Sequence, residues 1–160
     1  MPFDAPFQLG PFTVDSEGRL SPGEPHAAPA FLFRWRDRVV RARLAQADVG
    51  DGRLRLQATI GRVASTAGTP DDTLRPRSFA LLRWLERAMP AAWQVSLLAD
   101  HRVRLEIETR IALPITAAAL LTEITRFLLD LAPYLDLLDE TGLGRTAIAG
   151  QLTSLPVARG

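Results

Sequence analysis

The stretch Phe31–Ile60, FLFRWRDRVVRARLAQADVGDGRLRLQATI, decides the fold, because apolar and polar side chains alternate along it in three runs. Alternation with a period of two is the pattern of a strand with one buried and one solvated face. The alternation changes phase near Arg36–Arg38. A change of one residue moves every following side chain to the other face, so the sequence predicts a turn or bulge at that point.

A second turn is predicted at Asp48–Gly52, where the sequence is DVGDG. Glycine and aspartate favour turns because they tolerate backbone conformations that other residues avoid. The three runs therefore predict a three-stranded antiparallel meander. One face is apolar, and the other carries Arg side chains toward solvent.

A helix is predicted after the polar loop 64–73, with Asp72 or Thr73 as its N-cap and Pro90 ending it. A proline is tolerated in the first turn of a helix, where its missing N–H has no partner to lose. The residues at helical spacing, which we expect to face the sheet, are Phe79, Leu82, Leu85 and Met89.

A hairpin follows over Trp93–Leu113, with Asp100 and His101 in its turn. Pro114 ends the second strand and Thr116 caps a long helix that Gly142 ends. Pro133 lies inside this helix and removes one backbone donor, which predicts a kink. The expected apolar stripe consists of Leu120, Ile124, Phe127, Leu128, Leu131, Leu135 and Leu138.

The predicted fold class is α+β, with an antiparallel sheet of about five strands and helices packed on one of its faces. We divide the chain into a proline-rich N-terminal arm at 1–30, a single domain at 31–141 and a C-terminal tail at 142–160. Within the arm, Phe12–Leu20 predicts two short strands around a Ser-Glu-Gly turn.

Composition excludes several function classes. The chain has 160 residues, 47% of them hydrophobic, and a net charge of +1. These values are typical of one globular domain and give no general attraction to nucleic acid or acidic membranes. There is no Cys, hence no disulfide or thiolate site, and all 19 basic residues are Arg, which excludes Schiff-base chemistry. No window of about 18 residues lacks charge, and the first residues do not resemble a signal peptide, so we expect a cytoplasmic protein without a membrane span.

Candidate catalytic and metal-binding residues are few. The two histidines, His26 and His101, lack the spacing of a metal site. Glu106 and Glu108 would share one strand face, but Arg104 and Arg110 flank them, and this pattern favours cross-strand ion pairs over acid–base chemistry. We therefore expect no catalytic residue, no cofactor and no metal.

Two sets of residues are candidates for partner binding. Local charge is uneven, with eight Arg against three Asp over 31–62, and one Arg against five carboxylates over 111–141. The first set, for an acidic partner, is Arg34, Arg36, Arg41 and Arg43. The second is apolar and lies off the predicted helix stripes. We expect these residues to form a homodimer interface or a partner groove. The apolar set consists of Leu81, Trp84, Leu121 and Leu129, with Tyr134 and Leu137 nearby in the sequence.

The order of elements, three strands, helix, two strands and helix after an arm, resembles the fold of type III secretion chaperones and of the bacterial YbjN family. The resemblance is best at Val103–Leu138, where an alternating strand ends at Pro114, Thr116 follows as a cap, and an apolar helix stripe comes next. It implies a small non-enzymatic protein that dimerises and binds extended segments of other proteins.

The leading functional hypothesis is a protein-binding module, chaperone- or adaptor-like, that uses strand addition or an apolar groove. The alternative is a carrier of a small apolar ligand, held in a cavity between the sheet and the long helix. A nucleic-acid partner is disfavoured, because strand parity places Phe33 and Trp35 on the face opposite Arg34 and Arg36. An enzyme ranks last.

Overall fold

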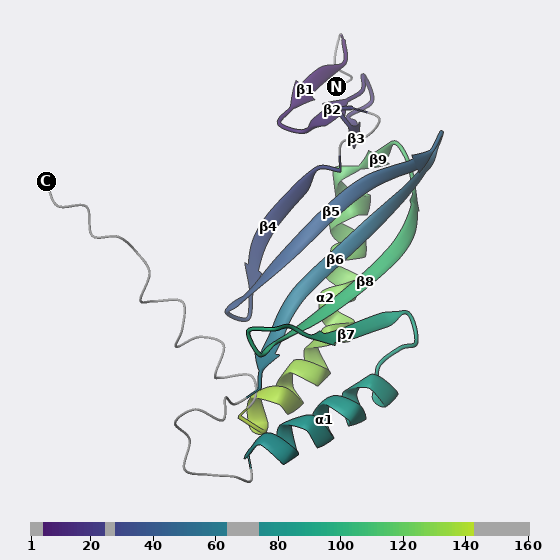
Figure 1. Ribbon diagram of the computed structural model, residues 1–160. Coiled ribbons are helices and arrows are strands. Elements are labelled where there is room, and N and C mark those ends of the chain that lie inside the picture. The colour runs from purple at the N-terminus through teal and green to yellow at the C-terminus, as the bar shows by residue number, and fades with distance from the viewer. Residues whose placement is uncertain (1–4, 25–27, 64–73, 143–160) are drawn as a thin grey trace, which may run out of the picture.

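The computed structural model describes residues 5–24, 28–63 and 74–142, and Figure 1 shows how the elements are arranged. A long twisted sheet stands in front, and α2 runs behind it along much of its length, with α1 beside the lower part of α2. The fold is α+β, as the sequence predicts.

Five antiparallel strands form the main sheet in the order β4-β5-β6-β8-β7. The first three make the predicted meander, and β7 and β8 make the predicted hairpin on its far side. Their bounds are Ala30–Trp35 for β4, Arg38–Asp48 for β5, Asp51–Arg62 for β6, Trp93–Leu97 for β7 and Arg102–Ala112 for β8.

The predicted turn between the first two strands is a two-residue loop of Arg36 and Asp37. Both residues have positive φ, at 47° and 58°. Two successive positive φ values define the turn type whose twist matches a β-hairpin. The loop explains the phase change in the sequence, because the strand after it begins with Arg38 on the same face as Trp35, its cross-strand partner.

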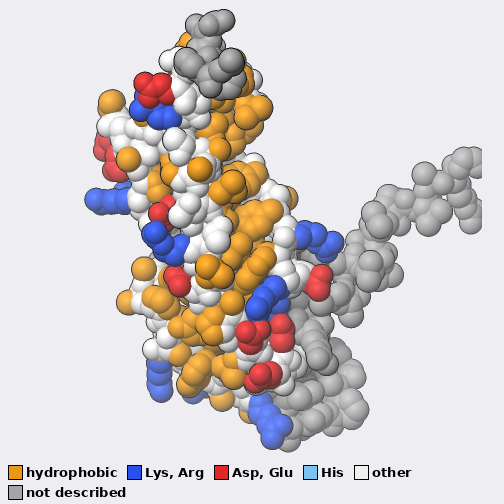
Figure 2. Space-filling model, turned by 180° about the vertical axis from the view of Figure 1, so that it is seen from behind, with side chains coloured by type: hydrophobic (Ala, Val, Ile, Leu, Met, Phe, Trp, Pro, Cys, Tyr) orange, Lys and Arg blue, Asp and Glu red, His pale blue; other side chains and the backbone are white. Residues whose placement is uncertain are grey.

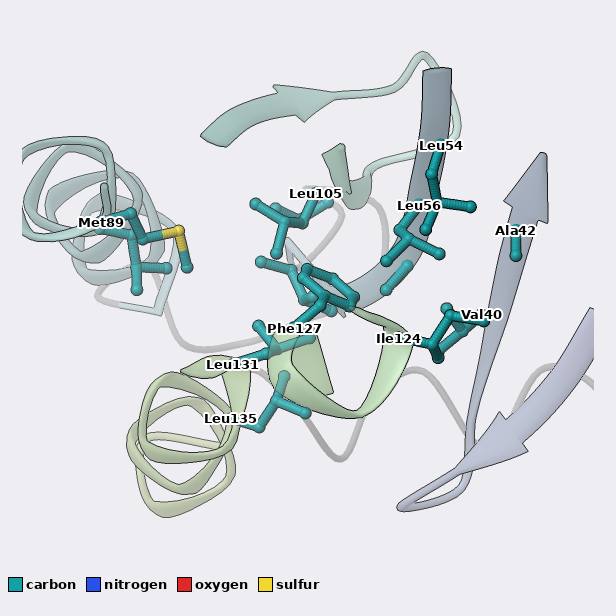
Figure 3. Packing of buried hydrophobic residues seen from close by; sticks show 14 of the residues in the cluster. Val40, Ala42, Leu54, Leu56, Met89, Leu105, Ile124, Phe127, Leu131 and Leu135 are labelled. Carbon is teal, nitrogen blue, oxygen red and sulfur yellow. The ribbon is translucent and has the colours of Figure 1, made fainter. Parts of the chain in front are cut away.

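Both helices pack on the apolar face of the sheet. Helix α1 covers Leu74–Ala88 and α2 covers Ala117–Glu140. Figure 3 shows Leu105 and Leu56 of the sheet pointing toward Phe127 and Leu131 of α2. The predicted stripe of α2 is buried except for Leu128, which is partly buried. Burial of large apolar side chains from the two layers supplies the main stabilisation of the domain.

The ends of α2 follow the sequence signals. Thr116 is extended, and its side chain accepts a hydrogen bond from the Ala119 backbone N–H at 3.1 Å. Gly142, just beyond the helix, has φ of 82°, the left-handed conformation that suits glycine there. The expected N-cap of α1, Asp72 or Thr73, lies outside the described residues, as does the tail beyond Gly142.

The arm contributes a second, smaller antiparallel sheet in the order β1-β2-β3-β9. Its strands are Phe7–Leu9, Phe12–Val14, Arg19–Pro22 and Ile115–Thr116. The two predicted strands around Ser16–Gly18 are present as β2 and β3. Strand β1 was not predicted, nor was the pairing of β3 with β9, which joins the arm to the segment entering α2.

Candidate functional site

Strand β4 is one edge of the main sheet, and its backbone geometry is set by the Arg36-Asp37 loop. The residues that flank a two-residue hairpin loop exchange backbone hydrogen bonds, and every second pair does the same. The Leu44 N–H donates to the Pro29 carbonyl at 2.9 Å, so the same alternation of bonded and non-bonded pairs holds at the other end of β4. The N–H and C=O groups of the intervening residues therefore point away from β5, toward the free edge. These residues are Ala30, Leu32 and Arg34.

The side chains of these edge residues lie on the outer face of the sheet, opposite the helices. Arg34 is exposed, and beside β4 the exposed Arg41 and Arg43 of β5 lie at the positions paired with Leu32 and Ala30. Arg34 and Arg41 have no hydrogen bond or ion pair within the described residues. Arg43 donates from Nε to the Ala28 carbonyl at 3.4 Å. We call the free edge of β4 with Arg34, Arg41 and Arg43 the edge surface.

Arg36 does not belong to the edge surface, contrary to its expected place beside Arg34. It occupies the loop, and its guanidinium binds Asp136 of α2 at 2.5 Å. It also lies over the Trp35 ring, 5.1 Å from the ring centroid. The turn ends the alternation at Trp35, so strand parity does not determine the direction of the next side chain.

Arg38 points inward, between the sheet and α2. Its side chain is only 7% exposed and pairs with Asp139 at 2.5 Å, while Nη1 donates to the Arg36 carbonyl. The Arg38 Nε has no hydrogen-bond partner among residues 5–24, 28–63 and 74–142. Together with the Arg36–Asp136 pair, this contact joins the β4–β5 loop to the last turns of α2.

The two glutamates of β8 are paired across the sheet, as the sequence predicts. Glu108 accepts from Arg53 and Arg55 of β6, at 2.8 and 2.7 Å, and Glu106 accepts from Gln57 and lies 3.4 Å from Arg55. The hydrogen bond from Arg55, followed by the one from Arg53, lowers the pKa of Glu108. Both carboxylates are therefore engaged by side chains of β6 and not by each other.

A hollow of about 550 Å³ lies on the outer face, next to the glutamate pairs. Among the residues around it are Arg62, Arg102 and Arg104, and we call it the arginine hollow. From the sequence, Arg104 is recognised only as a neighbour of Glu106, and nothing predicts that Arg62 lies beside it. A register shift between Thr59 and Gly61 brings Arg62 opposite Arg102. The bulge changes the parity of the strand, so that Val63 is buried after Ile60, but one apolar residue beyond the bulge is too short a run to predict the change from the sequence.

The apolar candidates lie on the opposite side of the molecule from the edge surface. Leu121 and Leu129 of α2 are 61% and 67% exposed and line a shallow hollow with Thr125 between them. We call this area the helix patch, with the residues Leu121, Thr122, Thr125, Arg126, Leu129 and Asp130. Figure 2 shows a band of hydrophobic side chains along this side of the molecule, with charged side chains at its borders.

The other apolar candidates divide between surface and core. Trp84 on α1 is 47% exposed, as expected of an interface residue. Leu81 packs against the core. Tyr134 is half-buried, and its ring contacts that of Trp93 in a tilted arrangement, with the centroids 5.8 Å apart. Its hydroxyl donates to the Ala88 carbonyl, so Tyr134 joins α2 to the end of α1.

The space between the sheet and α2, where an apolar ligand would lie in the alternative hypothesis, is occupied by side chains. Leu105, Leu131 and Leu135 are fully buried there (Figure 3). The edge surface and the arginine hollow lie on the outer face of the sheet, and the helix patch lies on the exposed face of α2.

Metal chemistry has no candidate in the described part of the chain, where no group of three or more metal-ligating side chains comes together. His101 lies in the β7–β8 turn with φ of 65°, as predicted, and His26 lies outside the described residues. No described helix is long and apolar enough to cross a membrane. Comparison of the chain with protein-family models, with curated proteins and with solved structures finds no match.

Proposed function

We propose that this chain is a non-enzymatic protein-binding module, chaperone- or adaptor-like, that acts as a dimer. It accepts an extended acidic segment of a partner protein as an additional strand at β4. The observation that carries the proposal is that, among the described strands, β4 has a neighbour on one side only. Next to this open side lie Arg34 and Arg41, which make no hydrogen bond or ion pair within the described residues. An exposed sheet edge is a template for strand addition, in which backbone hydrogen bonds supply affinity and alternate side chains supply specificity.

The opposite edge, β7, is a poorer template. The Leu98 N–H donates to the Arg102 carbonyl, so every second residue counted back from Leu98 bonds to β8. The backbone groups that face outward therefore belong to Trp93, Val95 and Leu97. The Trp93 N–H is already bound to the Pro90 carbonyl. The outer-face residues of β7 are Gln94 and Ser96, which carry no charge to select a partner.

The side chains around β4 define the segment that fits. On the inner side, Phe31, Phe33 and Trp35 are only partly buried, so an added strand would place its apolar residues beside them. On the outer side, its residues would lie beside Arg34 and near Arg41, and acidic side chains would be favoured there. The expected segment therefore alternates apolar and acidic residues.

The dimer in this proposal uses the helix patch. Leu121 and Leu129 lie four residues to either side of Thr125, so a twofold axis at Thr125 would bring Leu121 of one copy against Leu129 of the other. The border of the patch carries both signs, with Arg126 beside Glu123 and Asp130 in the next turn. Such a surface is complementary to a second copy of itself, which the resemblance to dimeric secretion chaperones also implies.

The binding test uses two labelled eight-residue peptides, one alternating Val and Glu and the other alternating Val and Lys. Fluorescence anisotropy is expected to show saturable binding of the Glu peptide alone. Leu32→Pro removes an N–H that points to the free edge and is expected to abolish binding. The matched control, Leu97→Pro, makes the same change at the other edge and is expected to leave the Kd unchanged. Equal binding by the two proline variants would refute strand addition at β4.

A further inference from the structure

The arginine hollow has a net positive lining that the edge surface does not explain. Its lining includes five Arg, but the Arg38 guanidinium points inward to Asp139, so four Arg stand against the two carboxylates of Asp37 and Asp100. Asp100 already forms an ion pair with the Arg102 side chain. Hydrogen bonds from the Arg102 backbone N–H, and then from its side chain, lower the pKa of Asp100. The charge of Arg62 lowers it further. The full lining is Asp37, Arg38, Val39, Arg41, Gln57, Ala58, Thr59, Arg62, Leu98, Asp100, Arg102 and Arg104.

Three of these guanidinium groups have no hydrogen bond or ion pair within the described residues, namely those of Arg41, Arg62 and Arg104. The Nε atom of Arg104 is buried and has no acceptor in the part of the chain that the structure describes. A buried donor without a partner is energetically costly, more so if it is charged, so such groups usually meet a ligand or ordered water. Elsewhere on the same face, Arg53 and Arg55 are neutralised by Glu108.

The arrangement around the hollow suits a compact anion. Arg41 comes from β5, Arg62 from β6 and Arg104 from β8, while Thr59, Arg104's cross-strand neighbour, also lines it. Guanidinium groups converging from different strands can bind a tetrahedral oxyanion through paired N–H donors. The outer-face strand positions of the described sheet carry no aromatic side chain, so nucleic-acid bases would find nothing on which to stack.

We propose that the arginine hollow binds the phosphoryl group of a small phosphorylated molecule, with Arg62 and Arg104 as its main ligands and Arg41 at its border. A volume of about 550 Å³ exceeds that of a phosphate ion and suits a small phosphate ester. This site goes beyond the protein-binding function, since its two main ligands lie on β6 and β8 and not at the β4 edge.

The test titrates inorganic phosphate at constant ionic strength, with chloride as the balancing anion, and follows both the melting temperature and the ³¹P NMR line. The wild type is expected to show saturable binding and, at phosphate ten times above the Kd, a melting temperature about 3–5 °C higher than in chloride. Arg104→Gln and Arg62→Gln are expected to weaken binding at least about tenfold. Arg110→Gln is expected to leave the Kd unchanged, since Arg110 lies on the same strand as Arg104 but outside the hollow and has no partner among the described residues.

Three results would overturn the site. The first is the absence of any effect of phosphate beyond that of chloride in the wild type. The second is an equal loss of phosphate binding in Arg104→Gln, Arg62→Gln and Arg110→Gln. The third is tighter binding of a single-stranded oligonucleotide that all three variants weaken alike. The second and third results would indicate a diffuse polyanion surface. The phosphate titration contains no peptide, so a negative result would not bear on strand addition at β4, which the peptide-binding experiment tests separately.

Discussion

Arg38 brings a charge into the layer between the sheet and α2, and the two members of its ion pair differ in exposure. The Arg38 side chain is 7% exposed, whereas that of Asp139 is 39% exposed. A charge that loses its partner in a buried place is costly, while one at the surface is solvated by water. Replacing Asp139 and replacing Arg38 should therefore lower the free energy of unfolding by different amounts.

We predict that Asp139→Ala lowers the free energy of unfolding by about 3 kcal/mol, because it leaves Arg38 buried without a counter-charge. Arg38→Met should cost about 1 kcal/mol or less, since Met fills the space and Asp139 remains hydrated. Urea unfolding measured by circular dichroism gives both values. A greater loss in Arg38→Met than in Asp139→Ala would contradict this account of the pair.

Glu108 gives a prediction about pH. Its pKa in the folded protein lies below its ordinary value of 4.5, chiefly through the hydrogen bond from Arg55. Folding therefore favours the charged form, and the stability that this provides is present above pH 4.5 and is lost as the pH falls through the lower, folded pKa. The stability difference between wild type and Glu108→Gln should be largest near neutral pH and shrink below pH 4.5. A stability difference that grows as the pH falls would contradict a lowered pKa of Glu108.

For single residues, the sequence predicts side-chain direction better in strands than in loops. The alternation of Val40, Ala42 and Leu44 with Arg41 and Arg43 places each side chain on its correct face. The direction of Arg36 could not be predicted, because it lies in a loop whose backbone has positive φ and whose Arg-Asp sequence lacks the usual Gly or Asn. Its partner Asp136 is 100 residues away in the sequence.

At the scale of elements, β4 combines an ordinary hairpin partner on one side with a free edge on the other. This asymmetry predicts that proline is tolerated at alternate residues only. Leu32→Pro should change the free energy of unfolding by about 1 kcal/mol or less, since its N–H makes no bond within the sheet. Phe33→Pro should cost about 3 kcal/mol more than Phe33→Ala, which removes the ring but keeps the N–H bond to β5. Equal costs of proline at the two positions would mean that the edge is not free.

The predicted elements of the main domain agree with the structure because each has its own local signal. Alternation indicates the strands, Thr116 and Gly142 bound α2, and the apolar stripe of α2 identifies its buried face. Two strands of the small sheet have no such signal: β1 and β9 are three and two residues long, and their pairing depends on tertiary packing. The arginine hollow is likewise a product of register, which a bulge near Gly61 sets.

At the scale of the whole molecule, the two faces present different surfaces. The outer face of the sheet carries the edge surface and the arginine hollow, and the helix side carries the helix patch. The separation means that a dimer formed through α2 would leave both copies of β4 open to partners. Two open edges in one dimer would bind a partner with two suitable segments more tightly than either edge alone.

We predict a dimer for the wild type in native mass spectrometry, with Leu121→Glu and Leu129→Glu monomeric at the same concentration. A charge at either position would be buried against an apolar neighbour in the twofold arrangement. Leu32→Glu is the matched control, since Leu32 is as exposed as Leu129 but lies on the other side of the molecule. A wild-type monomer, or a dimer that survives both helix substitutions, would contradict the proposed interface.

Hydrogen exchange at β4 tests the central claim most directly. In the free protein, the amides of Leu32 and Arg34 should exchange rapidly, while those of Phe31 and Phe33 are protected by β5. Adding the alternating Val–Glu peptide should protect Leu32 and Arg34 and leave Phe31 and Phe33 unchanged. If the peptide binds and these two amides still exchange rapidly, or if protection develops at Val95 and Leu97 instead, then the partner strand does not add to β4.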